Sequence, residues 1–346
     1  MNYTLNIRGR LLDLSEPIVM GILNVTPDSF FADSRMQTEA QIVRRAHQIV
    51  EEGAAIIDIG ACSTRPDSEP VDEKEEMARL RRALGVVRRE LPEAVISVDT
   101  FRPDVARMAV EELGADIIND VGVVGNASQR SSSLVGNASQ RSDAADVTLG
   151  SVTYYDATLG SVAHYDAMAR LNVPYILTSQ EPTLRDTLLF FAEKVQQMHD
   201  VGQKDIILDP GFGFGKTVDQ NFELLSQLEC LQVMELPVLV GVSRKSMIWK
   251  TLDCHPEDAL NGTTALNAVA LMKGASILRV HDVRQAVECI TLIKGVKGVK
   301  GVKGVKGVKG VKGVNGVKGV KVKDDSITAP FPSSYWEDDK GKNYCL

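Results

Sequence analysis

Two groups of polar side chains stand at the ends of short apolar runs in this sequence, and the first group has the chemistry of an anion site. The group combines an amide, two hydroxyls, two guanidinium groups and an imidazole: Asn24, Ser63, Thr64, Arg65, Arg279 and His281. Such donors converge where proteins bind phosphates and other oxyanions. The Asn24 amide oxygen is also a suitable ligand for Mg2+, which accompanies phosphates and takes few protein ligands. Taken singly, each of these residues is also consistent with a structural cap or a surface ion pair.

The second group consists of two carboxylates, an amide and an ammonium: Asp99, Asn119, Asp209 and Lys245. Carboxylates at the ends of apolar runs are costly to bury unless they are paired. One carboxylate fits the adjacent N–H and NH2 groups of an aminopyrimidinone edge through two hydrogen bonds, and Lys245 suits the ring carbonyl. The group therefore favours a flat heterocycle as ligand. A buried Asp–Lys pair that stabilises the core is the alternative interpretation.

The segment GFGFGKT (211–217) resembles a phosphate-binding loop but lacks its spacing. That loop requires a glycine five positions before Gly215, where this chain has Pro210. We expect the segment instead to bring its backbone and Phe214 close to a planar ligand.

The elements that must position these residues are eight apolar runs of strand length. They are IVMGILN (18–24), AAIIDIG (54–60), AVISVD (94–99), ADIIN (115–119), VPYIL (173–177), DIILD (205–209), LPVLVG (236–241) and SILRVH (276–281). Short apolar runs that alternate with helical segments are typical of buried parallel strands. Eight of them predict a single-domain α/β fold, a (β/α)8 TIM barrel, whose active site lies at the carboxyl ends of the strands.

Helical patterns fill the intervals between the runs. The segment 38–53 has helical periodicity and ends at Gly53, 72–91 begins acidic and ends basic, and 102–114 has Pro103 at its start. Further helices are predicted at about 181–201, 218–234, 256–273 and from 282 onward. This strand–helix alternation with right-handed crossovers closes into a barrel.

Repeats mark two segments that do not belong to this pattern. After the fourth strand, VGNASQRS occurs at 124–131 and 135–142, and TLGSV occurs at 148–152 and 158–162. We interpret 122–165 as a duplicated, expanded loop, with a partner-binding loop as the alternative. From Lys294 to Lys321 the chain consists of K-G-V units, too rich in glycine for a helix and too charged to pack. The predicted organisation is a barrel at 1–293 and a flexible low-complexity tail at 294–346.

Composition excludes several classes of function. The chain has 346 residues and a net charge of -7, and residues 294–323 hold ten lysines and no acid, so the remainder is strongly acidic. An acidic barrel argues against nucleic-acid binding. No apolar stretch is long enough to span a membrane, and the amino terminus does not have the pattern of a secretory signal. The five cysteines are scattered without metal-ligand spacing, which favours a cytoplasmic location.

Seven motifs in order resemble dihydropteroate synthase. They are MGILNVTPDSF (20–30), GAAIIDIGACSTRP (53–66), ISVDT (96–100), IIND (117–120), DPGFGFGK (209–216), VGVSRKSMI (240–248) and ILRVHDV (277–283). The resemblance covers about residues 12–293 outside the duplicated loop. It implies a (β/α)8 transferase of folate biosynthesis, the target of sulfonamides. Such an enzyme joins 6-hydroxymethyl-7,8-dihydropterin pyrophosphate to p-aminobenzoate and releases pyrophosphate.

The resemblance also implies roles for individual residues. Asp99, Asn119, Asp209 and Lys245 correspond to the pterin pocket, lined by Phe214 and Gly241, and Asn24 corresponds to the Mg2+ ligand. Thr64, Arg279 and His281 correspond to pyrophosphate contacts, with Ser63 and Arg65 nearby. The p-aminobenzoate side corresponds to Thr26, Pro27, Asp28, Phe30, Arg65, Pro66 and Ser246. The catalytic residues are then Asp99, Lys245, Arg279 and His281, and family members often form homodimers.

The sequence departs from the family pattern after the fifth strand, where TSQEPTLRD (178–186) replaces a methionine-histidine-methionine segment. Two other functions therefore stay open at this point. One is a pterin barrel that transfers a methyl group from a methylated folate, against which the STRP and SRKS motifs argue. The other is a non-catalytic pterin-binding paralogue, against which the complete set of site residues argues.

Overall fold

Eight parallel strands form the centre of the protein. The computed structural model describes residues 3–25, 35–62, 71–122 and 162–298. The strands are β3 (Ile18–Asn24), β4 (Ile56–Gly60), β5 (Val95–Asp99), β6 (Ile117–Asp120), β7 (Tyr175–Thr178), β8 (Ile206–Asp209), β9 (Leu239–Val240) and β10 (Ile277–Val280). Each lies within a predicted apolar run or extends one residue beyond it, because a strand covered on both faces consists of apolar residues throughout.

The strands are hydrogen-bonded in the order β8-β7-β6-β5-β4-β3-β10-β9. A parallel bridge from Leu208 to Val238, with the Leu208 N–H donating to Pro237 O at 2.9 Å, joins β8 to the segment before β9 and closes the ring. The predicted (β/α)8 barrel is therefore confirmed. Strand β9 is shorter than the predicted 236–241, in part because Pro237 has no N–H to donate to the ladder.

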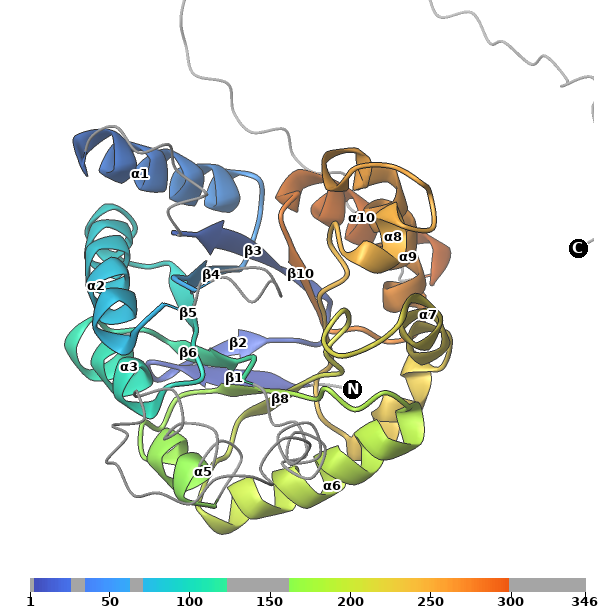
Figure 1. Cartoon of the computed structure of the whole chain (residues 1–346), viewed down its shortest axis with the longest axis horizontal. Helices are drawn as coiled ribbons and strands as arrows, with labels where there is room; N and C mark the ends of the chain where they lie inside the picture. Colours follow the sequence, from blue (N-terminus) through green and yellow to red (C-terminus); the bar gives the residue numbers. More distant parts are fainter. Residues whose placement is uncertain (1–2, 26–34, 63–70, 123–161, 299–346) are drawn as a thin grey trace, which may run out of the picture. The chain divides into compact units, whose positions relative to one another are not determined.

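Helices surround the strands on the outside (Figure 1). They are α1 (Arg35–Glu51), α2 (Glu73–Glu90), α3 (Pro103–Arg107), α5 (Val162–Ala169), α6 (Leu184–Asp200), α7 (Val218–Ser226), α8 (Ser246–Trp249), α9 (Leu260–Met272) and α10 (Val283–Val296). Side chains cap the amino-terminal ends of several helices. Asp72 caps α2, Thr183 caps α6, and Thr217 with Gln220 forms a capping box on α7. The predicted helix 102–114 divides into α3 and a π-helical turn, Met108–Glu112.

A β-hairpin that the sequence analysis did not predict covers the amino-terminal end of the barrel. Strands β1 (Thr4–Ile7) and β2 (Arg10–Asp13) are joined by Arg8 and Gly9, both with positive φ, as a tight two-residue turn requires. The hairpin's Leu5 and Ile7 are buried in one cluster with residues from the barrel strands, Met20, Ile56, Ile117, Ile176, Ile207, Leu239 and Ile277. The hairpin therefore closes this end and leaves the opposite end for a site.

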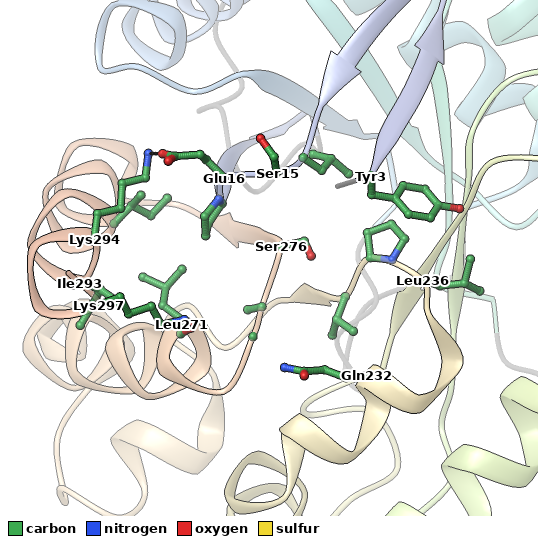
Figure 2. A pocket seen from close by; sticks show the side chains of 17 residues that line it. Tyr3, Ser15, Glu16, Gln232, Leu236, Leu271, Ser276, Ile293, Lys294 and Lys297 are labelled. Atoms are coloured by element: carbon green, nitrogen blue, oxygen red, sulfur yellow. Dashed lines mark hydrogen bonds and ion pairs between the residues drawn. The ribbon is translucent and has the colours of Figure 1, made fainter. Parts of the chain in front are cut away.

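A cavity of about 310 Å³ lies at the same amino-terminal end (Figure 2). Residues that precede strands line it, among them Pro17, Val238 and Ser276. Lys294 in the last turn of α10 pairs with Glu16, and Lys297 Nζ donates to Leu271 O at 2.7 Å. Because the strand ends that carry the predicted site lie at the opposite end, this cavity is separate from that site.

Two predicted boundaries need correction. Helix α10 continues to Val296, so the predicted domain boundary at Ile293 is three residues early; the contacts of Lys294 and Lys297 hold the first K-G-V unit against the barrel. The predicted loop 122–165 includes the first residues of α5, which begins at Val162 and buries His164 and Tyr165. The rest of that loop from residue 123 on, and the tail from 299, lie outside the described residues. In the described ranges, no helix combines the length and apolarity that crossing a membrane requires.

Candidate functional site

Strand register aligns three of the predicted site residues at the carboxyl end of the barrel. Asn24 on β3 pairs with Gly60 on β4, Gly60 with Asp99 on β5, and Asp99 with Asn119 on β6. Gly60 carries no side chain between its neighbours. A Cβ placed there would lie 3.4 Å from Asn24 Oδ1 and 3.7 Å from Asp99 Oδ2, so these two oxygens face the position that the glycine leaves without a side chain.

Arg279 on β10 binds across the barrel to two carboxylates. Its Nη2 donates to Asp99 Oδ2 at 2.8 Å, and its Nε donates to Asp58 Oδ2 at 2.7 Å. Asn119 Nδ2 donates to the same Asp58 oxygen at 3.1 Å. Asp58 therefore fixes both the guanidinium and the amide. One of these partners, Asp99, belongs to the second group, so Arg279 links the predicted anion group to the predicted heterocycle group.

Asp58 is a site residue that the sequence analysis missed. It lies in the middle of β4 and is fully buried. The signal was present, since a lone carboxylate inside an apolar strand must find a partner. Asp58 is two residues before the end of its strand, whereas the predicted site residues follow from strand ends and the loops after them.

Burial and neighbouring charges set the ionisation of Asp99 and Arg279. Burial raises the pKa of Asp99 to about 7; Arg279 acts in the opposite direction, and the Asp58 carboxylate adds to the rise. The pKa of Arg279 is raised because the Asp58 and Asp99 carboxylates outweigh the effect of burial. Arg279 is therefore a permanent cation, whereas Asp99 changes its charge near neutral pH.

Asp209 ends β8 and Lys245 follows β9 at the same carboxyl end of the barrel, which we call the barrel mouth. Asp209 Oδ1 accepts from Gly211 N at 2.8 Å, and burial raises the pKa of this carboxyl, which Lys245 opposes. Lys245 Nζ donates to Phe212 O and lies 4.2 Å from the centre of the Phe214 ring. Burial lowers the pKa of Lys245 to about 8, against the attraction of Asp209. Asp209 also interacts electrostatically with Arg279, so both groups form one charged cluster.

His281 is held by a residue that the sequence analysis missed. Ser243 Oγ accepts from His281 N at 3.2 Å and lies 3.1 Å from His281 Nδ1. If the hydroxyl donates to Nδ1, the ring proton sits on Nε2. Burial lowers the pKa of His281 to about 4, and the charge of Arg279 lowers it further. At neutral pH His281 is therefore an uncharged ring that carries one N–H donor.

Replacing Ser243 with alanine is expected to weaken the binding of an anion at His281 about fivefold. The loss of one hydrogen bond costs about 1 kcal/mol, and the tautomer of the His281 ring is then no longer fixed. The Kd of pyrophosphate measured by calorimetry tests this. Ser226→Ala, at an exposed serine on α7 whose hydroxyl donates only to Glu223 O, serves as the control for a lost hydroxyl. An unchanged pyrophosphate Kd in Ser243→Ala would show that the hydroxyl does not orient the ring.

The remaining predicted residues divide into two sets. Gly241 lies beside Arg279, where an added Cβ would be 3.8 Å from the arginine Cβ, and Ser246 begins α8 directly after Lys245. The other side chains predicted for the p-aminobenzoate side, and part of the anion side, lie outside the described residues: Thr26, Pro27, Asp28, Phe30, Ser63, Thr64, Arg65 and Pro66.

The barrel and its polar mouth are those of a pterin-binding enzyme, and the family described as pterin binding enzyme matches residues 20–281. The dihydropteroate synthase of Escherichia coli K12 is 35% identical over 292 residues, which cover 83% of this chain and 94% of that protein. The chain therefore belongs to the dihydropteroate synthase family of transferases.

Solved structures agree with this membership. A Yersinia pestis dihydropteroate synthase with a pterine-sulfa conjugate superimposes with a TM-score of 0.67 at 31% identity, covering 86% of this chain and all of that one. A Xanthomonas albilineans dihydropteroate synthase with 4-aminobenzoic acid gives a TM-score of 0.69 at 33% identity, covering 86% of this chain and 99% of that one.

Proposed function

We propose that this chain condenses 6-hydroxymethyl-7,8-dihydropterin pyrophosphate with p-aminobenzoate to form 7,8-dihydropteroate and pyrophosphate. The observation that carries the proposal is the buried cluster at the barrel mouth, in which Asp99, Asn119, Asp209 and Lys245 meet around Arg279. Family membership and the ligands named for the relatives support both substrate classes.

In this proposal the pterin ring lies among Asp99, Asn119, Asp209 and Lys245. Ionised carboxylates accept from the ring N–H and amino groups, and Lys245 donates to the ring carbonyl. The Phe214 ring provides an apolar wall beside the Lys245 ammonium. Asn119 is already oriented by its bond to Asp58, so the pocket needs little rearrangement when the ring binds.

The leaving pyrophosphate is stabilised by Arg279 and His281. Arg279 Nε and Nη2 are engaged by carboxylates, while no acceptor among the described residues binds its Nη1, which leaves that donor for the anion. The neutral His281 adds an N–H donor. As the bond from the pterin methylene carbon to oxygen breaks, these donors receive the charge that develops on the departing oxygen. The uncharged aniline nitrogen then attacks this carbon and loses its proton to solvent.

The space between Asn24 and Asp99 fits a hard cation. Asn24 is exposed at the end of β3, and its amide oxygen faces the position beside Gly60 together with Asp99 Oδ2, the oxygen that also accepts from Arg279 Nη2. Amide and carboxylate oxygens are the ligands that Mg2+ takes when phosphate supplies others. We assign Mg2+ to this position with Asn24 as its ligand; when bound, the ion neutralises charge on the pyrophosphate.

The reaction is tested by incubating purified protein with the pterin pyrophosphate, p-aminobenzoate and Mg2+. Release of pyrophosphate together with formation of dihydropteroate is the expected result. Pterin binding without pyrophosphate release would instead indicate the non-catalytic paralogue. Turnover of a methylated folate would indicate a methyl transferase.

Pterin affinity is expected to be greatest between about pH 7 and pH 8. Asp99 accepts as an anion above its pKa of about 7, and Lys245 donates as a cation below its pKa of about 8. Affinity should fall on both sides of this window, which calorimetric Kd values from pH 5.5 to 9.5 measure. Asp99→Asn should remove the acidic limb only; an acidic limb that persists in this variant would assign it to another group.

Ending the chain after Lys300 is expected to leave kcat, KM and Tm unchanged, because we propose that the barrel and the basic tail are separate parts. Ending it after Ile293 should lower stability by about 1–2 kcal/mol, because the contacts of Lys294 and Lys297 are lost. Thermal unfolding and steady-state kinetics of both shortened chains check this. A large fall in kcat after the first truncation would give the tail a role in turnover.

We also propose a cytoplasmic homodimer without nucleic-acid or membrane partners. The supporting observation for the dimer is a set of exposed apolar side chains on the adjacent helices α9 and α10: Val269, Met272, Leu292 and Val296. The four cysteines of the described part, Cys62, Cys230, Cys254 and Cys289, are free, which suits a reducing compartment.

A further inference from the structure

The loop between β8 and α7, residues Pro210–Thr217, is joined to the preceding loop by a single ammonium group. Lys216 Nζ lies 3.1 Å from Gly211 O, 3.2 Å from Ser179 O and 3.5 Å from Phe214 O. Ser179 follows β7, whereas the other two carbonyls belong to the β8 loop. An ammonium has three donors, and this one places all of them on backbone carbonyls of two neighbouring loops.

These two loops approach as closely as backbone allows. Gly211 has a φ of +67°, and a Cβ at this position would lie 1.9 Å from Ser179 O. Only glycine is compatible with such an approach. The contact gathers several carbonyl dipoles with their negative ends together, and the Lys216 charge compensates their repulsion.

The same loop surrounds Lys245, a residue of the proposed pterin pocket. Phe212 O accepts from Lys245 Nζ, the Phe214 ring lies 4.2 Å from this nitrogen, and a Cβ at Gly213 would come within 2.8 Å of Lys245 Cδ. The position of Lys245 therefore depends on the path of residues 212–214.

Asn221 at the start of α7 fixes the outer side of this path. Its Oδ1 accepts from Gly213 N at 2.7 Å, and its Nδ2 donates to Thr217 O at 2.6 Å. Lys216 fixes the inner side through its contacts with Gly211 and Phe214. The segment that contacts Lys245 is thus held from both directions.

We infer that Lys216 is a positioning residue for the pterin site, acting through the 212–214 segment on Lys245 and Phe214 without contacting the substrate. This inference rests on the proposed function. The Lys216 ammonium holds the 210–217 loop in place, and its loss would release this loop and thereby widen the pterin pocket. Burial lowers the pKa of Lys216 to about 8, and Asp209 and Glu181 oppose that change, while Lys245 carries a like charge nearby.

The test compares Lys216→Met with the wild type. Calorimetry with 6-hydroxymethyl-7,8-dihydropterin pyrophosphate is expected to give a Kd about tenfold higher at unchanged binding stoichiometry. The KM for the pterin should rise similarly, while the KM for p-aminobenzoate stays within about twofold. Lys204→Met, at an exposed lysine before the opposite end of β8, is the matched control and should match the wild type.

A double-mutant cycle separates positioning from general stability. Because Lys216 acts through Phe214, the effect of Lys216→Met on Kd should shrink to about twofold or less in a Phe214→Leu background. Lys216→Arg, which retains the charge, should recover part of the affinity. If Lys216→Met does not fold, Lys216→Gln carries the same comparison, since its amide reaches fewer carbonyls.

Two results would overturn the inference. One is an unchanged pterin Kd with reduced stoichiometry, which would indicate only a smaller folded fraction. The other is full additivity with Phe214→Leu. Neither outcome touches the proposed function, which fails if the wild type itself releases no pyrophosphate from the pterin pyrophosphate and p-aminobenzoate.

Discussion

Arg279→Met is expected to reduce kcat/KM at least 100-fold and to destabilise the fold by about 3–5 kcal/mol. The guanidinium is the shared partner of Asp58 and Asp99, and its side chain is only 15% exposed. Removing one partner of a buried ion pair leaves an uncompensated charge, and here two carboxylates are left together. The loss in rate follows because the same group faces the developing pyrophosphate charge.

Urea unfolding and steady-state kinetics measure the two effects separately. Arg81→Met is the control, because Arg81 pairs with Glu112 on the surface, where both side chains are about half exposed and the pair contributes about 0–1 kcal/mol. Adding Asp58→Asn to Arg279→Met should restore part of the stability, since it removes one of the stranded charges, but not the activity. A loss below 1 kcal/mol in the single variant would contradict this account of the network.

Lys245→Met is expected to raise the Kd of the pterin at least 100-fold while the protein remains folded. The ammonium is the donor proposed for the ring carbonyl, and it balances Asp209 at the same mouth. Without it, the buried carboxylate has lost its nearest cation, and a ligand carbonyl in this position finds no donor.

Calorimetry with the pterin substrate measures this change, with circular dichroism as the check on folding. Lys250→Met, at an exposed lysine five residues after Lys245 and directly after α8, provides the matched control. Retained affinity in Lys245→Met would place the pterin elsewhere in the barrel.

The arrangement of strands was predictable because each one is an apolar run of the right length, and the ring closes with the expected neighbours. Two features were not. The β1–β2 hairpin is made of strands of only four residues each, and its burial depends on a barrel end that exists only after folding. The shortness of β9 follows from hydrogen bonding around Pro237, which no periodicity reveals.

The site residues at the strand ends were predicted from the sequence, whereas the residues that hold them in place were not. Asn24, Asp99 and Asn119 come together because parallel register aligns strand ends, which the sequence pattern implies. Asp58, by contrast, acts from the barrel interior. Its importance, like that of Ser243 and Lys216, lies in contacts between residues far apart in the chain, which spacing within one motif cannot indicate.

The short β9 has a consequence for how the barrel opens. Both residues of β9 pair with β10, and only the single Leu208–Val238 bridge joins β8 to the segment before β9, so this junction is the least hydrogen-bonded seam of the ring. Asp209 and the 212–214 segment leave β8 on one side of this seam, and Lys245 follows β9 on the other. A pterin held between Asp209 and Lys245 would therefore bridge this junction, so the bound substrate would stabilise the barrel where its strands share the fewest hydrogen bonds.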